Sequence, residues 1–462
     1  MAGRRVVVVG AARSGIAAAR LLARRGARVT LTETRAAFAG ADDLRALGVE
    51  LELGGHRPET LSGADLIVTS PGVALDQPVF DAARARGVES IGELELAWRW
   101  LQGPVIAVTG TKGKSTTTTL IGRMVSAAGR PVLVGGNIGV PLSAQVDEST
   151  PQTVHVVEAS SFQLETTTTF RPWIALWLNF ADDHLDRHPT VDDYAAAKAR
   201  IFASQTGGDW AVVNADDAAV MARSSGIAAQ RVAFSPSGRP GAAFVIDGDW
   251  IGRRTTTGFE PLVPTAAIEL TGRHMQHNVL AAAAVAALAG VPPPAMVAAL
   301  KGFAGLEHVM EPAATIGGVR FVNDSKATNV EAARRSIESF ERGVVAIVGG
   351  RFKGGNLRDL REAMGARGRA VIAIGEAAPL VREALAGVVP VTDAASMDEA
   401  VQRGYEAAAP DGVVLLAPAC ASFDWFRDYA ERGKAFKDAV EQLGNAVGRS
   451  GRREQGHETQ ER

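Results

Sequence analysis

One pattern recurs along the sequence and restricts the chain to few folds: a short apolar strand, a glycine turn and then a helix. Near the start, residues 6–9 form such a strand, a helix is predicted over 14–25, and a second strand follows at 29–32. The pattern returns in "VIAVTGTKGKSTTTTL", residues 105–120, and in segments further along. Strands that alternate with helices form parallel-rich sheets with helices on their faces. The sequence therefore predicts an α/β fold.

The chain is too long for a single core. Its 462 residues fit about three domains. Connecting segments interrupt the strand–helix pattern, and they divide the chain into predicted domains at residues 1–95, 96–300 and 301–445. The last segment, 446–462, lacks apolar periodicity and is predicted to be a disordered tail.

Composition excludes several classes of protein. A net charge of −2 indicates no basic surface for nucleic acid, and no apolar run approaches the ~20 residues of a membrane-spanning helix. The one cysteine, Cys420, cannot form a disulfide within the chain. We therefore expect a cytoplasmic, monomeric protein that acts on small molecules and neither binds nucleic acid nor spans a membrane.

The glycine-rich loop quoted above has the composition of a phosphate-binding loop. It contains Gly110 and Gly113, followed by Lys114 and the hydroxyls of Ser115 and Thr116. In such loops backbone amides surround phosphate oxygens, a lysine reaches the terminal phosphates and a hydroxyl binds Mg²⁺. The first glycine of the common motif is missing, so an ordinary glycine-rich turn with a solvated lysine is the alternative. The strand before the loop and the helix after it favour phosphate binding.

Acidic and histidine side chains follow two later strands of the same domain. Glu158 ends the strand in "TVHVVEASS", and Asp182, Asp183 and His184 follow the strand in "PWIALWLNF". A carboxylate and an imidazole at adjacent strand ends provide a partial Mg²⁺ shell beside bound phosphates. Taken alone, each group would more often be a capped strand end. Lys198 lies two turns into the next predicted helix, where a lysine is by default solvated.

Seven short motifs occur in one order along residues 5–440: "GTKGKST", "ASSFQLE", "DDHLDRH", "YAAAKARI", "HNVLAAAA", "NDSKATN" and "LAPACASFD". In these motifs and their order the chain resembles the Mur ligase family. The resemblance implies an N-terminal Rossmann-like domain for a UDP-linked substrate, a central P-loop-type ATPase with a parallel-rich sheet, and a C-terminal Rossmann-like domain for an amino acid. The last two motifs are typical of the family member that adds D-glutamate.

The reaction that the resemblance implies is an ATP-dependent amide ligation in peptidoglycan precursor synthesis. The γ-phosphoryl group of ATP would pass to the alanyl carboxylate of UDP-N-acetylmuramoyl-L-alanine, and the amine of D-glutamate would attack the resulting acyl phosphate. A carboxylate is a poor electrophile until its oxygen becomes a good leaving group, which explains a phosphate loop in an amide-forming enzyme. Two Mg²⁺ ions and Lys114 would neutralise charge during the transfer.

The resemblance also implies roles for individual residues. The implied ATP contacts are Gly110, Thr111, Lys112, Gly113, Lys114, Ser115, Thr116, Asn278 and Asp324. The implied contacts with the UDP-linked substrate are Arg13, Ser14, Glu33, Thr34, Arg35, Gly72, Asn137, Ser160 and Gln163. Those with D-glutamate are Thr328, Lys353, Ser422 and Tyr429. The implied metal ligands are Ser115, Glu158, His184 and Lys198, the last as a carbamylated lysine; the implied catalytic residues are Lys114, His184 and Lys198.

Four positions depart from the family pattern. Lys112 replaces the asparagine that is commoner in this loop and adds a positive charge beside the phosphates. Val309 stands where many relatives have an arginine, and Met275 stands near a position where an asparagine often contacts the nucleotide. Tyr429 falls where phenylalanine is usual. The departures at 275 and 309 affect expected ATP contacts but not the phosphate loop.

Other functions stay open from the sequence. L-glutamate or another amino acid could replace D-glutamate, because residue spacing does not determine stereochemistry. A nicotinamide-dependent oxidoreductase is suggested by "VVVVGAARSG", although this turn lacks the middle glycine that lets backbone approach a pyrophosphate. A folylpolyglutamate-type ligase would share the ATPase domain, and a UDP-sugar-binding protein without turnover would fit the substitutions at 275 and 309.

Overall fold

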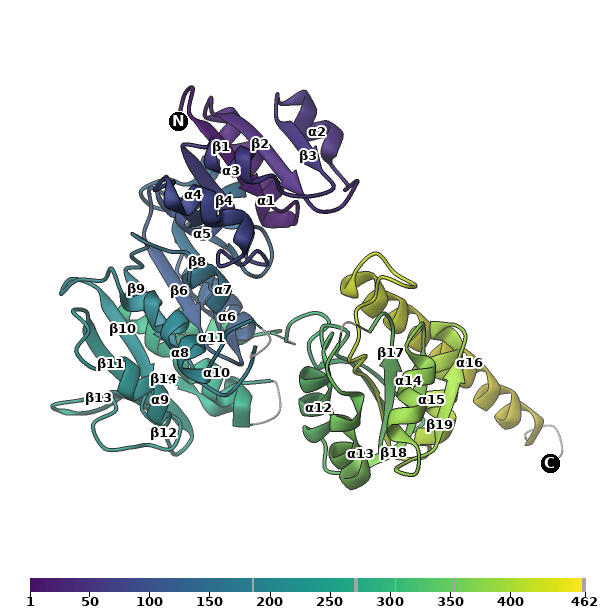
Figure 1. The fold of residues 1–462 in the computed structure, drawn as a ribbon. Coiled ribbons are helices and arrows are strands. Elements are labelled where there is room, and N and C mark those ends of the chain that lie inside the picture. The colour runs from purple at the N-terminus through teal and green to yellow at the C-terminus, as the bar shows by residue number, and fades with distance from the viewer. Residues whose placement is uncertain (185–186, 270–272, 304, 353, 459–462) are drawn as a thin grey trace. The chain divides into compact units, whose positions relative to one another are not determined.

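The chain forms two compact units, Met1–Phe303 and Ala304–Arg462, which are described separately below (Figure 1). The computed structural model describes residues 1–184, 187–269, 273–303, 305–352 and 354–458. The first unit contains two β-sheets and the second contains one. No helix in these ranges combines the length and the apolar character that crossing a membrane requires.

Five parallel strands form the first sheet, in the order β3-β2-β1-β4-β5. All but the first residue of β1 are buried, as expected for a parallel sheet with both faces covered. The strand–helix–strand pattern predicted at the start of the chain is confirmed as β1, α1 and β2. The strands are β1 Arg5–Val9, β2 Arg28–Glu33, β3 Glu50–Leu53, β4 Leu66–Thr69 and β5 Ser90–Gly92; the helices are α1 Arg13–Arg24, α2 Ala41–Ala46, α3 Pro58–Ser62, η1 Pro78–Phe80, α4 Asp81–Ala85 and α5 Glu93–Trp98.

The second sheet has nine strands in the order β14-β13-β12-β11-β10-β9-β6-β8-β7. Its strands from β7 to β12 pair in parallel, and β6 lies between β8 and β9. The strands are β6 Val105–Thr109, β7 Val132–Gly136, β8 Val154–Glu158, β9 Ile174–Trp177, β10 Trp210–Asn214, β11 Gln230–Ser235, β12 Phe244–Asp247, β13 Trp250–Thr255 and β14 Gly258–Pro264. The carboxyl ends of β6, β8 and β9 therefore meet at one edge of the sheet.

Helices follow most of these strands and cover the sheet. They are α6 Lys114–Ala127, η2 Leu142–Ala144, η3 Val146–Glu148, α7 Ser161–Leu164, α8 Val191–Ala199, η4 Arg200–Phe202, α9 Ala218–Arg223, η5 Thr265–Ala267, α10 Arg273–Leu288 and α11 Pro293–Leu300. Both α10 and α11 pack against α6. Residues 279–286 of α10 are fully buried, as expected for a helix that is apolar on all sides. The predicted alanine-rich helix is thus confirmed, and it ends before Gly290, whose φ is 77°.

The far edge of the nine-stranded sheet was not predicted. There β12, β13 and β14 form an antiparallel meander that extends the parallel part of the sheet. Gly248 lies in the first of its two tight connections and Gly258 begins β14 directly after the second, and both have positive φ. A continuous alternation of strands and helices would have required a helix in this segment.

The second unit contains a six-stranded sheet in the order β15-β16-β20-β17-β18-β19. Only β15 is antiparallel to its neighbour. The strands are β15 Glu311–Ile316, β16 Val319–Asn323, β17 Val344–Gly349, β18 Gly368–Ile374, β19 Val391–Ala394 and β20 Val413–Leu416; the helices are α12 Val330–Glu338, η6 Leu357–Leu360, α13 Arg361–Arg367, α14 Ala378–Leu385, α15 Met397–Ala408 and α16 Tyr429–Glu458. The last helix, α16, enters the segment that the sequence predicts as a disordered tail.

A buried carboxylate on α5 holds together the segment that joins the first two sheets. The Glu95 side chain has no exposed surface and accepts hydrogen bonds from the amides of Thr168, Thr169 and Phe170 at 3.0–3.1 Å. Burial raises the pKa of Glu95, but the hydrogen bonds from Thr169 and Thr168 outweigh burial and lower it overall. The ionised carboxylate therefore stabilises the fold.

We expect Glu95→Ala to destabilise the first unit by about 3 kcal/mol, because it leaves three amides without an acceptor. Thermal unfolding followed by circular dichroism would show a midpoint lower by several degrees. The loss would be present above the carboxyl's ordinary pKa of 4.5 and would shrink as the pH falls through the lowered value. Glu89→Ala removes an exposed partner of Arg99 and serves as the control. Equal midpoints for the two variants would contradict this role of Glu95.

Candidate active site

The loop between β6 and α6 adopts backbone conformations that favour glycine at two positions. Gly110 has a φ of 152° and Gly113 has a φ of 77°. A Cβ on Gly113 would lie 2.4 Å from the side-chain oxygen of Asn278, which belongs to α10. The predicted helix after the loop is confirmed as α6, which begins at Lys114. The amides of its first turn are therefore directed at the loop, as an anion site requires.

Asn179, which the sequence reasoning missed, holds this loop in shape. Its side-chain oxygen accepts hydrogen bonds from the amides of Thr111 at 3.1 Å and Lys112 at 2.9 Å. Its side-chain nitrogen donates to the carbonyl of Lys112 at 3.0 Å. Asn179 follows β9, the strand beside β6, and this position in "WLNFADD" is the one signal that could have indicated it. The backbone at Lys112 is therefore fixed from the neighbouring strand end.

Two lysines contact the backbone of the same loop. The Lys114 ammonium donates to the carbonyl of Thr111 at 3.0 Å, and the Lys198 nitrogen donates to the carbonyl of Gly110 at 2.9 Å. The Lys198 nitrogen also lies over the ring of Tyr194, 4.5 Å from its centre. The structure thus brings together two lysines that are separated by a long stretch of sequence.

Lys198 is buried, contrary to the solvated position that a helical lysine has by default. It is 1% exposed, on a helix whose first turn is capped by the Thr190 hydroxyl, which accepts from the amide of Asp193 at 3.1 Å. Burial lowers the pKa of Lys198 well below its ordinary 10.5, and the positive charge of Lys114 lowers it further. The carboxylate of Glu158 opposes this shift. An amine in this environment favours the neutral, nucleophilic form.

Glu158 ends β8 at the same sheet edge, and its carboxylate is buried. One oxygen accepts a hydrogen bond from the side-chain amide of Asn137 at 2.6 Å. The other oxygen has no hydrogen-bond partner within the ranges that the structure describes. A buried carboxylate oxygen without a donor is costly unless a cation neutralises it. This oxygen therefore fits the role of a cation ligand.

An aromatic cluster surrounds His184, and the rings that contact it come from two helices. The backbone φ of His184 is 56°. Its ring lies 4.9 Å from that of Phe162, and its amide donates to the Asp183 carboxylate at 3.0 Å. His188, which was not predicted, stacks on Phe162 at 5.5 Å and contacts the Ser161 hydroxyl at 3.0 Å. Burial lowers the pKa of His188. His188 therefore supports the position of Phe162, against which His184 packs.

The residues near the loop suit Mg²⁺, which prefers oxygen ligands and retains water and phosphate oxygens. The unpartnered oxygen of Glu158 and the hydroxyl of Ser115, in the first turn of α6, supply two such groups. The described ranges contain no cluster of three or more histidine, cysteine, aspartate or glutamate side chains arranged to hold a metal. A cation here would therefore need phosphate, water or a modified side chain to complete its shell.

Ser160 and Gln163, predicted to contact substrate, form the capping box of α7. The Ser160 hydroxyl accepts from the Gln163 amide at 3.2 Å, and the Gln163 side-chain oxygen accepts from the Ser160 amide at 3.0 Å. This pair satisfies two backbone donors at the start of the helix. The box leaves Ser160 partly exposed and buries Gln163.

In the first sheet, Glu33 organises the turn that follows β1. Its carboxylate accepts from the amide of Ala11 at 2.7 Å, the hydroxyl of Thr34 at 3.1 Å and the amide of Arg35 at 3.1 Å. The side chain of Arg35 also pairs with it at 3.0 Å. These hydrogen bonds, led by that with the Arg35 side chain, lower the pKa of Glu33 to about 2. Glu33, Thr34 and Arg35 thus lie together at the turn that follows β1.

The remaining residues predicted to contact the UDP-linked substrate lie close to this turn in the sequence or at its rim. Ser14 is in the first turn of α1, and Gly72 is exposed after β4. Arg13 is exposed and donates to the carbonyl of Gly139 at 3.1 Å. Through this bond Arg13 connects α1 to the loop that carries Asn137.

In the second unit, Asp324 follows β16 and is buried. One carboxylate oxygen accepts from the amide of Met310 at 3.2 Å, and the other contacts the Ser336 hydroxyl. Burial raises the pKa of Asp324. Val309 lies in the turn before Met310, and Met275, in the first unit, packs into the core of the nine-stranded sheet. Neither Val309 nor Met275 supplies a polar side chain to its surroundings.

Of the residues predicted to bind D-glutamate, Thr328 and Ser422 lie in loops after β16 and β20, and Tyr429 begins α16. Ser422 is buried, Thr328 is half-buried, and Tyr429 is exposed at the start of α16. The carbonyl of Tyr429 accepts from the Ser325 hydroxyl at 2.7 Å. Lys353 lies outside the described residues. The structure thus places three of the four residues at the carboxyl edge of one sheet, where ligands of open α/β sheets bind.

Family models match each of the three sheets in turn. The N-terminal domain described as MurD-like matches residues 4–92, the Mur ligase middle domain matches 108–286, and the Mur ligase glutamate ligase domain matches 310–420. The three matches together cover most of the chain.

Curated proteins match the chain over almost its whole length. The UDP-N-acetylmuramoylalanine–D-glutamate ligase of Acidobacterium capsulatum is 48% identical over 444 residues, covering 95% of this chain and 96% of the relative. The enzyme of the same name from Desulfosudis oleivorans is 44% identical over 449 residues, with 95% and 96% covered.

Solved structures share the fold at low sequence identity. The UDP-N-acetylmuramate-alanine ligase MurC of Thermotoga maritima superposes with a TM-score of 0.60 at 17% identity, over 95% of this chain and all of that chain. The MurF ligase of the same organism, solved in complex with ADP, has a TM-score of 0.56 at 15% identity, over 96% of each chain. The predicted three-domain α/β fold is confirmed, and with the domain matches and the identities above it follows that this chain belongs to the Mur ligase family.

Proposed function

We propose that the chain is the ATP-dependent ligase that joins D-glutamate to UDP-N-acetylmuramoyl-L-alanine in peptidoglycan precursor synthesis. The full-length relatives that bear this activity in their names support the substrates. Within the molecule, the chemistry is supported by the glycine-rich loop after β6. Lys114 and Lys198 donate hydrogen bonds to its backbone carbonyls, and Glu158 at the same sheet edge has a carboxylate oxygen without a hydrogen-bond partner in the described ranges. This arrangement suits charge neutralisation during phosphoryl transfer.

The loop and the first turn of α6 would bind the phosphates of ATP through backbone amides. The Lys114 ammonium, now on the Thr111 carbonyl, would turn to the β- and γ-phosphates. The alanyl carboxylate would take the γ-phosphoryl group, releasing ADP. The amine of D-glutamate would then attack the acyl carbon, forming the amide bond and releasing phosphate and a proton. For the phosphoryl transfer, ATP and the alanyl carboxylate must be held so that the attacking and the leaving oxygen are in line at the γ-phosphorus.

Magnesium would be held by Glu158, Ser115 and His184, with Lys198 as a carbamate. Bound there, the metal supplies positive charge to the phosphate oxygens during transfer. A carbamate replaces the amine of Lys198 by a negatively charged, oxygen-bearing group, which suits a hard cation. The burial of Lys198 and the lowered pKa of its amine support this modification, because only a neutral amine attacks carbon dioxide.

The two Rossmann-like domains would bind the other substrates. The turn organised by Glu33, with Arg35 and Ser14, would bind the uridine diphosphate part. Thr328, Lys353, Ser422 and Tyr429 would bind D-glutamate. We further propose that the enzyme works as a cytoplasmic monomer, without nucleic acid or a membrane span.

A panel of amino acids with ATP and UDP-N-acetylmuramoyl-L-alanine would test the function. We expect phosphate release that requires all three substrates and is at least about a hundredfold slower with L-glutamate, meso-diaminopimelate or lysine than with D-glutamate. Equal rates with a diamino acid would assign the chain to another branch of the family. Phosphate release without any amino acid would mean that the acyl phosphate is hydrolysed instead of aminolysed.

A further inference from the structure

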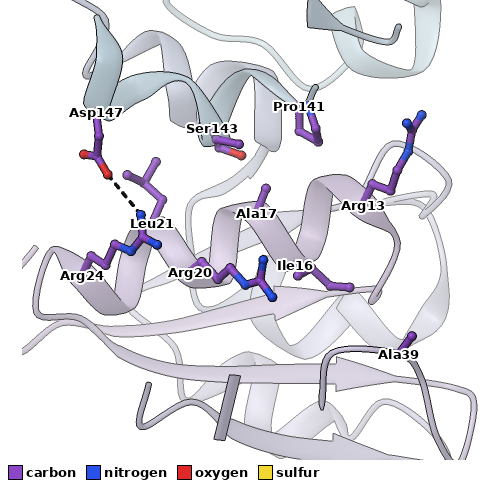
Figure 2. A pocket seen from close by; sticks show the side chains of 11 residues that line it. Arg13, Ile16, Ala17, Arg20, Leu21, Arg24, Ala39, Pro141, Ser143 and Asp147 are labelled. Carbon is purple, nitrogen blue, oxygen red and sulfur yellow. Dashed lines mark hydrogen bonds and ion pairs between the residues drawn. The ribbon is translucent and has the colours of Figure 1, made fainter. Parts of the chain in front are cut away.

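A pocket of about 450 Å³ lies in the first unit, between α1 and the short turns η2 and η3 that follow β7 (Figure 2). Its volume is in the range of sites that bind small molecules, about 300–1,000 Å³. One wall comes from the domain with the five-stranded sheet and the opposite wall from the domain with the nine-stranded sheet. None of the residues proposed for ATP or D-glutamate lines it.

The walls that face each other are apolar. Ile16, Ala17 and Leu21 line the pocket from α1, where Ala17 and Leu21 share a helix face at four-residue spacing and Ile16 adjoins Ala17. Pro141 and Ala144 face them from the turns after β7. Figure 2 shows the side chains of Ile16 and Ala17 on the helix surface below Pro141. A flat apolar group would be covered on two sides in this space.

The rim of the pocket is positively charged. Arg13, Arg20 and Arg24 line it from the start, the third turn and the end of α1, whereas Asp147 is the one carboxylate in the lining. Asp147 is already shared, because it pairs with Arg24 at 3.3 Å and with Arg25 at 2.8 Å. Arg20 pairs with Asp43 at 3.0 Å, outside the lining. The lining therefore has an excess of positive charge, which attracts an anion.

The far wall adds a buried hydroxyl. Ser143 lines the pocket at 3% exposure, and its side chain interacts with the buried carboxyl of Glu93, whose pKa is raised by burial and lowered in part by this contact. Its amide donates to the buried carboxyl of Glu93 at 2.6 Å, which fixes the backbone there.

The pocket is separate from the turn proposed for the uridine diphosphate group. Of the residues proposed for that group only Arg13 lines the pocket, and Glu33, Thr34 and Arg35 do not. Arg20 and Arg24 lie seven and eleven residues beyond Arg13, about 10 and 16 Å along the helix. An anion on these two arginines would thus lie well away from the turn at Gly10.

We propose that this pocket is a second ligand site, which binds a small amphipathic anion. The planar apolar part of the ligand lies between α1 and Pro141, and its carboxylate, sulfonate or phosphate group pairs with Arg20 and Arg24. Because the two walls belong to different domains, such a ligand also ties the packing of α1 to that of η2. This inference does not depend on the proposed ligase activity.

Calorimetric titration with 8-anilino-1-naphthalenesulfonate, an aromatic sulfonate, would test the site on the full chain. We expect saturable binding of one molecule that is unchanged by saturating UDP. Arg20→Gln should weaken it about tenfold, the effect of one charge-assisted hydrogen bond. Arg45→Gln is the matched control, because Arg45 is also an exposed arginine paired with an aspartate of α2 but lies outside the lining.

A second variant fills the pocket without changing its charge. Ala17→Phe on the partly exposed face of α1 should abolish binding of the probe while thermal unfolding shows a folded protein. The proposal would be overturned by the absence of saturable binding, by displacement of the probe with UDP, or by equal weakening in Arg45→Gln. Unchanged binding in folded Ala17→Phe would place the probe elsewhere and overturn it as well.

Discussion

Replacing Lys114 by alanine should lower kcat/KM for the ligation by at least about a thousandfold. The side chain follows the glycine turn at Gly113 and lies at the start of α6, where the helix amides and the ammonium can act on the same phosphate oxygens. Cations placed on a transferring phosphoryl group act mainly on the transition state, and removing one costs about 10²–10⁵ in rate. The loss should therefore appear mostly in kcat.

Phosphate release with all three substrates would measure this effect, with Lys112→Ala as the comparison. The Lys112 side chain is exposed, and the contacts of Lys112 with Asn179 are made by its backbone, which alanine retains. We expect Lys112→Ala to slow the reaction by less than about tenfold, because it removes only an exposed, screened positive charge near the phosphates. If Lys114→Ala kept more than about a tenth of the activity, the phosphoryl-transfer role of Lys114 would be wrong.

Much of the fold could be predicted because the local signals agree with the final structure. The apolar strand, glycine turn and helix at the start of the chain and at β6 are each specified by neighbouring residues. The meander β12–β14 was missed because the interpretation assumed that strands and helices would keep alternating. Its turns at Gly248 and Gly258 were available signals, since a glycine between two apolar runs favours a hairpin.

The candidate site was predictable only in part. Lys114 and Glu158 could be placed because Lys114 follows one buried strand and Glu158 ends another strand of the same sheet. Asn179 and His188 were missed because their contacts depend on which strand ends and helices become neighbours, and one sequence without the fold does not contain that information. Gln163 illustrates the reverse difficulty: its buried capping bond is a structural role in addition to its predicted contact with substrate.

Lys198 is the residue whose interpretation the structure changed most. By sequence alone it is one lysine on a helix, and solvation is the default. In the fold its amine is buried against Tyr194 and the Gly110 carbonyl, and its charged form is disfavoured by burial and by Lys114. A neutral amine can add carbon dioxide at a pH where an exposed lysine is protonated, because the pKa of Lys198 lies well below 10.5.

Replacing Lys198 by arginine should therefore abolish a carbamate and with it most of the activity. Arginine keeps a positive charge at all working pH values and does not form the carbamate. With ¹³C-labelled bicarbonate, we expect the wild-type protein to give a carbamate signal in the NMR spectrum that Lys198→Arg lacks, together with a loss in kcat of at least about a hundredfold. Lowering the pH through the amine's pKa should remove the signal, because the protonated amine does not react.

Lys434→Arg is the matched control for this experiment. Lys434 is exposed on α16 and pairs with Asp438 at 2.6 Å, so it lacks the burial that favours carbamate formation at Lys198. We expect Lys434→Arg to keep both the signal and the activity. A signal that persists in Lys198→Arg would assign the carbamate to another amine, and full activity of Lys198→Arg would show that the reaction needs no modified lysine at this position. Either result would leave Glu158 and Ser115 as the metal ligands to be tested next, because their oxygens do not depend on the modification.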